Sequence, residues 1–107
     1  MIVKTKKGDL PVRYGMNALA IFGDLTGKSM NVVMKSLDSL EDLQLSELLA
    51  FVYAGFKDGA RFAKEEFKIE SVEDVGDMID EDADLIGKMF EAFNGDSEEV
   101  EGDSKKK

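Results

Sequence analysis

The sequence predicts a mainly α protein, a small bundle of about four to five helices with a short N-terminal β-hairpin and a disordered acidic C-terminal tail. Two observations favour this fold class. Apolar residues between positions 45 and 56 recur at the spacing of a core-facing helix. The first 14 residues instead hold two short β-branched runs around Gly and Asp, which is typical of antiparallel strands. At 107 residues the chain is long enough for one domain with its own core, which we expect at residues 1–94.

The N-terminal hairpin is expected within residues 1–14. Its strands are Ile2–Thr5 and Leu10–Tyr14, and residues 6–9 form the connection between them. Pro11 has no amide hydrogen to donate and therefore suits an edge strand or a strand start. These features favour a two-stranded ribbon over a larger sheet.

The first helix is expected to begin near Met16 and to end at Gly27. Apolar residues change to helical spacing after Met16, and Gly27 readily adopts the left-handed conformation that closes a helix. Residues 29–44 fit helical spacing only loosely, because their Asn, Ser and Asp side chains compete for backbone hydrogen bonds. We expect a short helix or turn there, followed by a loop.

A central helix follows, with a continuous apolar stripe. The stripe is formed by Leu45, Leu48, Leu49, Val52, Tyr53 and Phe56. Ser46 is expected to cap the start of this helix. Gly55 predicts a place where another helix packs closely, and Gly59 predicts the end of the helix.

Two further helices are expected in the C-terminal half. Ser71 and Asp74 resemble a capping box that opens the first of them, whose apolar face comprises Val72, Val75 and Ile79. The stripe of the last helix comprises Leu85, Ile86, Met89, Phe90 and Phe93. Asn94–Gly95 is expected to end this helix. Residues 95–107 are strongly charged and hold one large apolar residue, which predicts the disordered tail.

The formal net charge of -9 is unevenly distributed along the chain. Residues 1–35 carry a net charge of +4, residues 65–104 carry -14, and the last three lysines add +3. Such a field disfavours nucleic acid and anionic membranes, and it favours a basic protein partner or self-association of opposite ends. A solvated acidic face that only keeps the protein soluble explains the same pattern.

The start of the chain and its lack of cysteine bear on localisation. The first residues contain no apolar run long enough for a signal peptide or a membrane span. The absence of Cys fits a reducing compartment. We therefore expect a cytoplasmic protein.

The residue types needed for most catalytic and metal sites are scarce, because the chain has no His and no Cys. Gly23–Ser29 has three residues between its glycines, where a phosphate-binding loop has four. Asp80–Glu91 partly resembles a calcium loop, but Leu85 stands where the sharp turn requires Gly. We predict no catalytic, cofactor-binding or metal-binding residues. A hydrolase would require a cleft with perturbed carboxylates.

Nucleic-acid binding would depend on the basic residues near the N-terminus. Lys4, Lys6, Lys7 and Arg13 would need to form a contiguous basic face with aromatic side chains on which bases stack. Tyr14 is the aromatic residue nearby. We expect no nucleic-acid partner.

Methionine is abundant for a chain of this length, with six residues beside seven Phe. Most of them fall at helical core positions, so core packing explains them first. Met is also overused where a surface must adapt to a partner, so some of these residues could line a groove for a helical or disordered segment. The candidate partner-binding residues are Met16, Met30, Met34, Phe56, Met78, Met89 and Phe93.

Several short motifs follow one another in an order that resembles a known family. They are Val12-Arg13-Tyr14-Gly15-Met16-Asn17-Ala18-Leu19, Leu25-Thr26-Gly27, Leu48-Leu49, Tyr53-Ala54-Gly55-Phe56 and Val72-Glu73-Asp74-Val75. With the basic hairpin before them, they make residues 2–93 resemble the tail assembly chaperones of long-tailed bacteriophages and prophages.

This resemblance implies a small, mainly helical, non-enzymatic protein in the host bacterial cytoplasm. Members of the family escort the long, aggregation-prone tape measure protein while tail tube subunits assemble around it. The implied partner is the tape measure protein, with the tail tube protein and a second copy of the chain as further candidates. The family supplies no residue-level binding motif.

The charge distribution supports an alternative function of a different class. An acidic protein can mimic nucleic acid, or act as an adaptor, and bind a basic protein partner. This alternative predicts an ordered acidic face on the last two helices and binding that depends strongly on salt.

Overall fold

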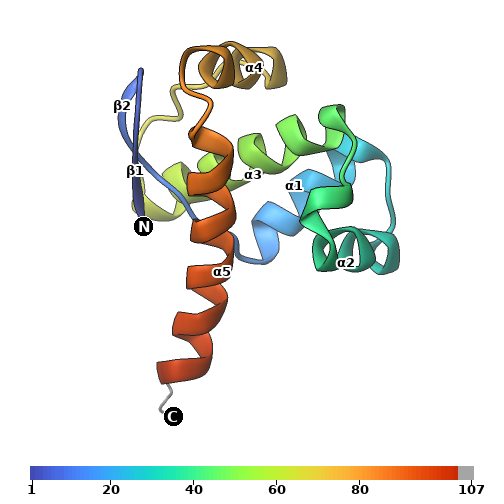
Figure 1. Cartoon of the computed structure of the whole chain (residues 1–107). Helices are drawn as coiled ribbons and strands as arrows, with labels where there is room; N and C mark the ends of the chain where they lie inside the picture. The colour runs from blue at the N-terminus through green and yellow to red at the C-terminus, as the bar shows by residue number, and fades with distance from the viewer. Residues whose placement is uncertain (104–107) are drawn as a thin grey trace.

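The computed structural model describes residues 1–103, with side chains through Gly95. Over this range the chain forms one antiparallel hairpin followed by five α-helices and a short 3-10 turn, which confirms the predicted fold class (Figure 1). The elements are β1 (Ile2–Thr5), β2 (Gly8–Pro11), α1 (Met16–Thr26), α2 (Met30–Asp38), η1 (Leu40–Asp42), α3 (Leu45–Ala63), α4 (Val72–Glu81) and α5 (Leu85–Asp103).

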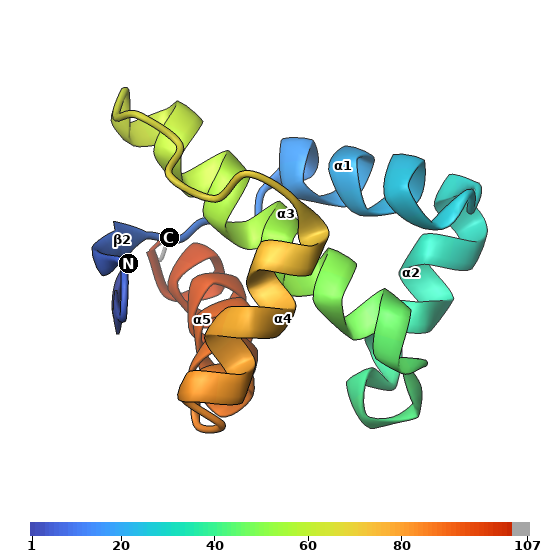
Figure 2. The same cartoon turned by 90° about the horizontal axis from the view of Figure 1, so that it is seen from above.

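Helix α3 forms the centre of the molecule. Figure 2 shows α1 along one side of α3, and α4 and α5 on the other side. The side of the molecule away from the hairpin is formed by α2, which follows α1 after a short connection. Two residues of the predicted stripe, Val52 and Phe56, are buried in this packed interior. Phe51 is buried there as well.

The second strand lies earlier in the chain than the sequence predicts, at Gly8–Pro11 instead of Leu10–Tyr14, so residues 6 and 7 alone connect the strands, and not residues 6–9. The register of the hairpin pairs Val3 with Leu10, and both of these side chains are buried. Strand β2 ends at Pro11 instead of Tyr14, because the Arg13 amide donates to the Gly55 carbonyl of α3 at 3.0 Å. The Val12 amide still donates to the Met1 carbonyl at 2.7 Å, and the chain crosses α3 from Arg13 onward. We call residues 12–15 the crossing segment.

Two glycines of α3 have roles other than those predicted. Gly59 does not end the helix, which continues to Ala63 and closes at Lys64 in the left-handed conformation, with φ of 60°. A Cβ atom on Gly59 would overlap the Pro11 carbonyl, and one on Gly55 would overlap the Tyr14 ring. The missing side chains admit the end of β2 at Gly59 and the crossing segment at Gly55. The atoms nearest to a Cβ on Gly55 would be those of the Tyr14 ring, and not those of the second helix that the sequence suggested.

The ends of the helices agree with the sequence in part. Gly27 closes α1 with φ of 71°, as predicted. Ser71 accepts from the Asp74 amide at 3.2 Å, and this confirms it as the N-cap of α4. The N-cap of α3 is Gln44 and not Ser46, since the Gln44 amide donates to the Glu47 carboxylate at 3.0 Å.

The last helix does not end at Asn94–Gly95 as predicted. Helix α5 continues to Asp103, because Gly95 does not take up the left-handed conformation that would stop it. The predicted disordered tail at residues 95–107 therefore overlaps this helix. The last four residues of the predicted tail, 104–107, lie outside the described part of the chain.

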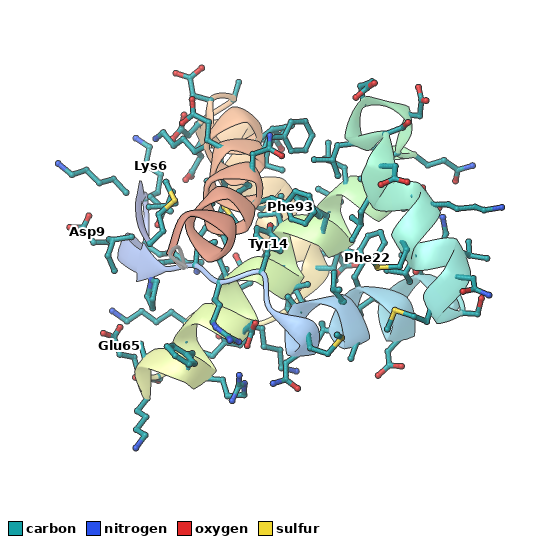
Figure 3. All side chains as sticks on the ribbon, turned by 90° about the horizontal axis from the view of Figure 1, so that it is seen from below. Lys6, Asp9, Tyr14, Phe22, Glu65 and Phe93 are labelled. Atoms are coloured by element: carbon teal, nitrogen blue, oxygen red, sulfur yellow. The ribbon has the colours of Figure 1, made fainter. Side chains whose placement is uncertain are left out.

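An aromatic cluster joins the crossing segment to three helices. The Tyr14 ring stacks on Phe51 at a centroid distance of 4.5 Å. Phe93 of α5 meets both rings edge-on, and Phe22 of α1 meets Phe51 in the same way. Figure 3 shows Tyr14 and Phe93 together near the middle of the molecule. The segment 12–15 is thus held between α3 and α5.

Candidate protein-binding surface

Three of the seven candidate contact residues are exposed methionines. Met30 and Met34 lie one turn apart on α2, with 48 % and 50 % of their surface exposed. Met16 is 67 % exposed at the first residue of α1, at the opposite end of that helix from α2 (Figure 2). The structure therefore brings Met30 and Met34 together and places Met16 elsewhere.

The other four candidates belong to the packed interior. Phe56, Met78 and Met89 are buried, and Phe93 is partly buried in the aromatic cluster. Their helical spacing is the same in the sequence whether a residue faces the core or a partner. Core packing therefore explains these four residues.

Further apolar residues outside the candidate set are exposed on α1, α2 and α3. Val32 lies between the two methionines of α2, Leu25 is in the last turn of α1, and Leu45 is the first residue of α3. The sequence predicts that Leu45 belongs to a core-facing stripe, but this residue is 71 % exposed at the first position of its helix. Val32 is two residues from each methionine and so faces another side of α2. We call Met30 and Met34 the α2 surface.

A lysine fixes the position of α2 relative to α3. Lys28 Nζ lies 2.6 Å from the Glu47 carboxylate of α3 and donates to Ser36 Oγ of α2 at 3.0 Å. The hydrogen bond from Lys28 and the one from the Gln44 amide hold the pKa of Glu47 below its usual value. The exposed methionines thus stand on a helix with a defined orientation.

A buried carboxylate lies on the other half of α3. Asp58 has 0 % exposure, and sequence reasoning assigned it no role. Arg61 Nη2 lies 2.8 Å from its Oδ1, whereas Arg13 Nη1 and the Gly15 amide lie 3.2 and 3.0 Å from its Oδ2. We call Arg13, Gly15, Asp58 and Arg61 the Asp58 clasp. It attaches the segment before α1 to the central helix.

Acidic residues form an ordered exposed set on α4 and the turn after it. The exposed members are Glu73, Asp77, Asp80, Glu81 and Asp84. Two neighbouring carboxylates are already paired, since Lys7 lies 3.1 Å from Asp74 and Lys88 lies 3.1 Å from Asp82. The Glu70 amide and Lys7 lower the pKa of Asp74, and Lys88 lowers that of Asp82.

The described residues show no arrangement typical of a metal centre or of an acid–base pair. No group of three or more acidic side chains in this part of the chain is placed to hold a metal ion. The pKa values of Glu47, Asp74 and Asp82 are all lowered, chiefly by hydrogen bonds from Lys28, the Glu70 amide and Lys88, respectively. A hollow of about 190 Å³ beside Phe56 and Ile69 is smaller than most substrate pockets.

The comparison with known proteins adds no further assignment. The chain matches no model of a protein family, no curated protein and no solved structure. None of its helices within the described residues is long and apolar enough to cross a membrane.

Proposed function

We propose that this protein is a non-enzymatic phage tail assembly chaperone that binds the tape measure protein in the host cytoplasm. The observation that carries the proposal is the pair Met30 and Met34, exposed one turn apart on a helix held in place by Lys28. Flexible, polarisable methionine side chains can adapt to the varied apolar faces of a helical client. Binding by mass action then keeps the client in solution without any chemical step.

The proposal is tested by binding of the purified tape measure protein to the full chain. Met30→Ser together with Met34→Ser is expected to weaken binding at least about tenfold, since each buried methionine contributes about 1.5–3 kcal/mol. Asn31→Ser, also exposed on α2, is the matched control and should leave the affinity unchanged. Equal affinities for the double variant and the control would contradict the proposal.

A second candidate function rests on the acidic residues of α4. Their exposure favours an adaptor or nucleic-acid mimic that binds a basic protein, and ordered carboxylates are what such a partner would contact. This function predicts that Asp77→Asn with Glu81→Gln weakens partner binding, whereas the methionine variant does not. The two proposals therefore assign binding to different helices, α2 and α4.

A further inference from the structure

The Asp58 clasp contains more positive charge than its buried carboxylate requires. Asp58 accepts hydrogen bonds from two guanidinium groups and one backbone amide, so its two oxygens are saturated. One carboxylate neutralises one arginine, which leaves a net charge of +1 at this place. Arg13 and Arg61 are not buried with it, because 37 % and 52 % of their side-chain surfaces are exposed.

Each guanidinium group also keeps donors directed away from Asp58. Arg13 uses Nη1 for the carboxylate, and Arg61 uses Nε and Nη2. Arg13 Nε and Nη2 and Arg61 Nη1 hydrogen-bond to no acceptor among the described residues. These unused donors belong to groups that bind carboxylates in a planar, two-point geometry.

The two arginines are held in place before any ligand arrives. The shared buried carboxylate fixes both groups, and the Arg13 guanidinium stacks over the Phe62 ring at 4.3 Å. Gly15 contributes as well, because a Cβ atom there would overlap the Arg13 guanidinium. A fixed guanidinium loses less conformational entropy on binding than a free surface arginine does.

An exposed aromatic side chain adjoins these donors. Phe62 keeps 63 % of its surface exposed, although Arg13 covers one face of its ring. The surface thus combines spare guanidinium donors with an uncovered apolar group. Its chemical complement is a carboxylate followed closely by an apolar side chain.

We propose that Arg13, Arg61 and Phe62 form a docking site for an acidic segment of a partner protein, with an Asp or Glu carboxylate bound by the two arginines and an apolar neighbour on Phe62. Positive charge of the site and negative charge of the segment select this occupant. The site goes beyond the proposed chaperone function, because it is separate from the α2 surface and takes a ligand of opposite character.

The probe for this site is a short capped peptide that alternates Glu and Leu, titrated into the isotope-labelled full chain. We expect saturable shifts of the Nε–H signals of Arg13 and Arg61 and of the Phe62 ring signals. A peptide of the same length with Gln in place of Glu should bind at least about tenfold more weakly, because charge-assisted bonds are lost. Equal binding of the two peptides would overturn the proposal.

Two variants and a control locate the binding on the protein. Arg61→Gln and Phe62→Ala should each lower the peptide affinity, the former by at least about tenfold, while Arg13 and Gly15 continue to hold Asp58. Lys57→Gln removes another exposed cation of α3 and should change nothing. Unchanged affinity in Arg61→Gln, with folding shown by its amide spectrum, would overturn the site.

Two further measurements distinguish other occupants. Inorganic phosphate that competes with the peptide at equal concentration would show a general anion site and overturn the peptide assignment. In sedimentation of the full chain alone, we expect no self-association through this site. Association that rises with concentration and disappears in Arg61→Gln would contradict this expectation. Such association would assign the site to a second copy instead.

The docking site and the proposed function can be tested separately. Met30→Ser together with Met34→Ser should lose binding of the tape measure protein and keep binding of the peptide.

Discussion

Asp58 shows how one residue can determine the path of a whole segment. It is the one charged side chain among the described residues that is classed as buried, and it joins position 58 to positions 13 and 15 across a long stretch of sequence. An aspartate off the apolar stripe reads in the sequence as a solvated helix residue. Its role depends on arginines brought to it by the fold, so hydrophobic periodicity could not reveal it.

Replacement of Asp58 by Ala is expected to lower the free energy of unfolding by about 3 kcal/mol, because two guanidinium groups and the Gly15 amide lose their shared acceptor. Urea unfolding followed by circular dichroism measures this change. Asp77→Ala, on the exposed face of α4, is the control and should change stability by less than about 0.5 kcal/mol. Similar midpoints for the two variants would show that the clasp does not stabilise the fold.

At the scale of elements, apolar spacing identified the helices better than it identified their ends. The stripe from Leu45 to Phe56 predicts α3 correctly, since burial of one face imposes that spacing. The sequence predicts helix ends at Gly59 and at Asn94–Gly95, although both glycines lie within a helix. A helical glycine can stop a helix or admit a close neighbour, and only the tertiary contact decides between these roles.

Because the hairpin approaches α3 closely at Gly59, we expect alanine to destabilise the protein there and not at Gly76. Gly59→Ala is expected to lower the free energy of unfolding by about 2 kcal/mol, since its methyl group would overlap the Pro11 carbonyl of the backbone. Gly76→Ala in α4 is the matched control: its methyl group would meet Leu49 at 3.9 Å, an ordinary contact. There we expect a gain of about 0.5 kcal/mol from helix propensity. Thermal or urea unfolding compares the two, and a stable Gly59→Ala would refute the tight crossing.

Ion pairs between elements make stability depend on pH. Lys28, the Glu70 amide with Lys7, and Lys88 lower the folded-state pKa of Glu47, Asp74 and Asp82, respectively. Because these values lie below those of the unfolded chain, the stabilisation is complete above about pH 4.5 and is lost as the pH falls through the folded values.

We therefore expect the urea midpoint to decline below about pH 4.5 and to decline less steeply in a Lys28→Met variant, where Glu47 keeps the Gln44 amide but has lost Lys28. Asn31→Ser, which removes no ion pair, should retain the slope of the unaltered chain. Parallel slopes in Lys28→Met and the unaltered chain would contradict the role of this pair.

At the scale of the whole molecule, the two kinds of surface lie on different helices. The α2 surface is on the side away from the hairpin, whereas the acidic residues follow α4 and the turn after it (Figure 1). The sequence indicated both the charge segregation and the excess of methionine. It could not say which methionines are exposed, because Met34 and Met89 have similar helical settings until neighbouring helices cover one and not the other.

This separation predicts how binding of the tape measure protein depends on salt. If the α2 surface carries the complex, its affinity should change by less than about threefold between low and physiological ionic strength, since apolar burial is not screened by ions. Binding through the acidic residues of α4 would instead weaken steeply as salt shortens the range of charge interactions. Titration calorimetry at several salt concentrations measures this dependence for the full chain and for Asp77→Asn with Glu81→Gln. A steep salt dependence that disappears in the charge variant would favour the acidic adaptor, and a flat one retained in that variant would favour the chaperone.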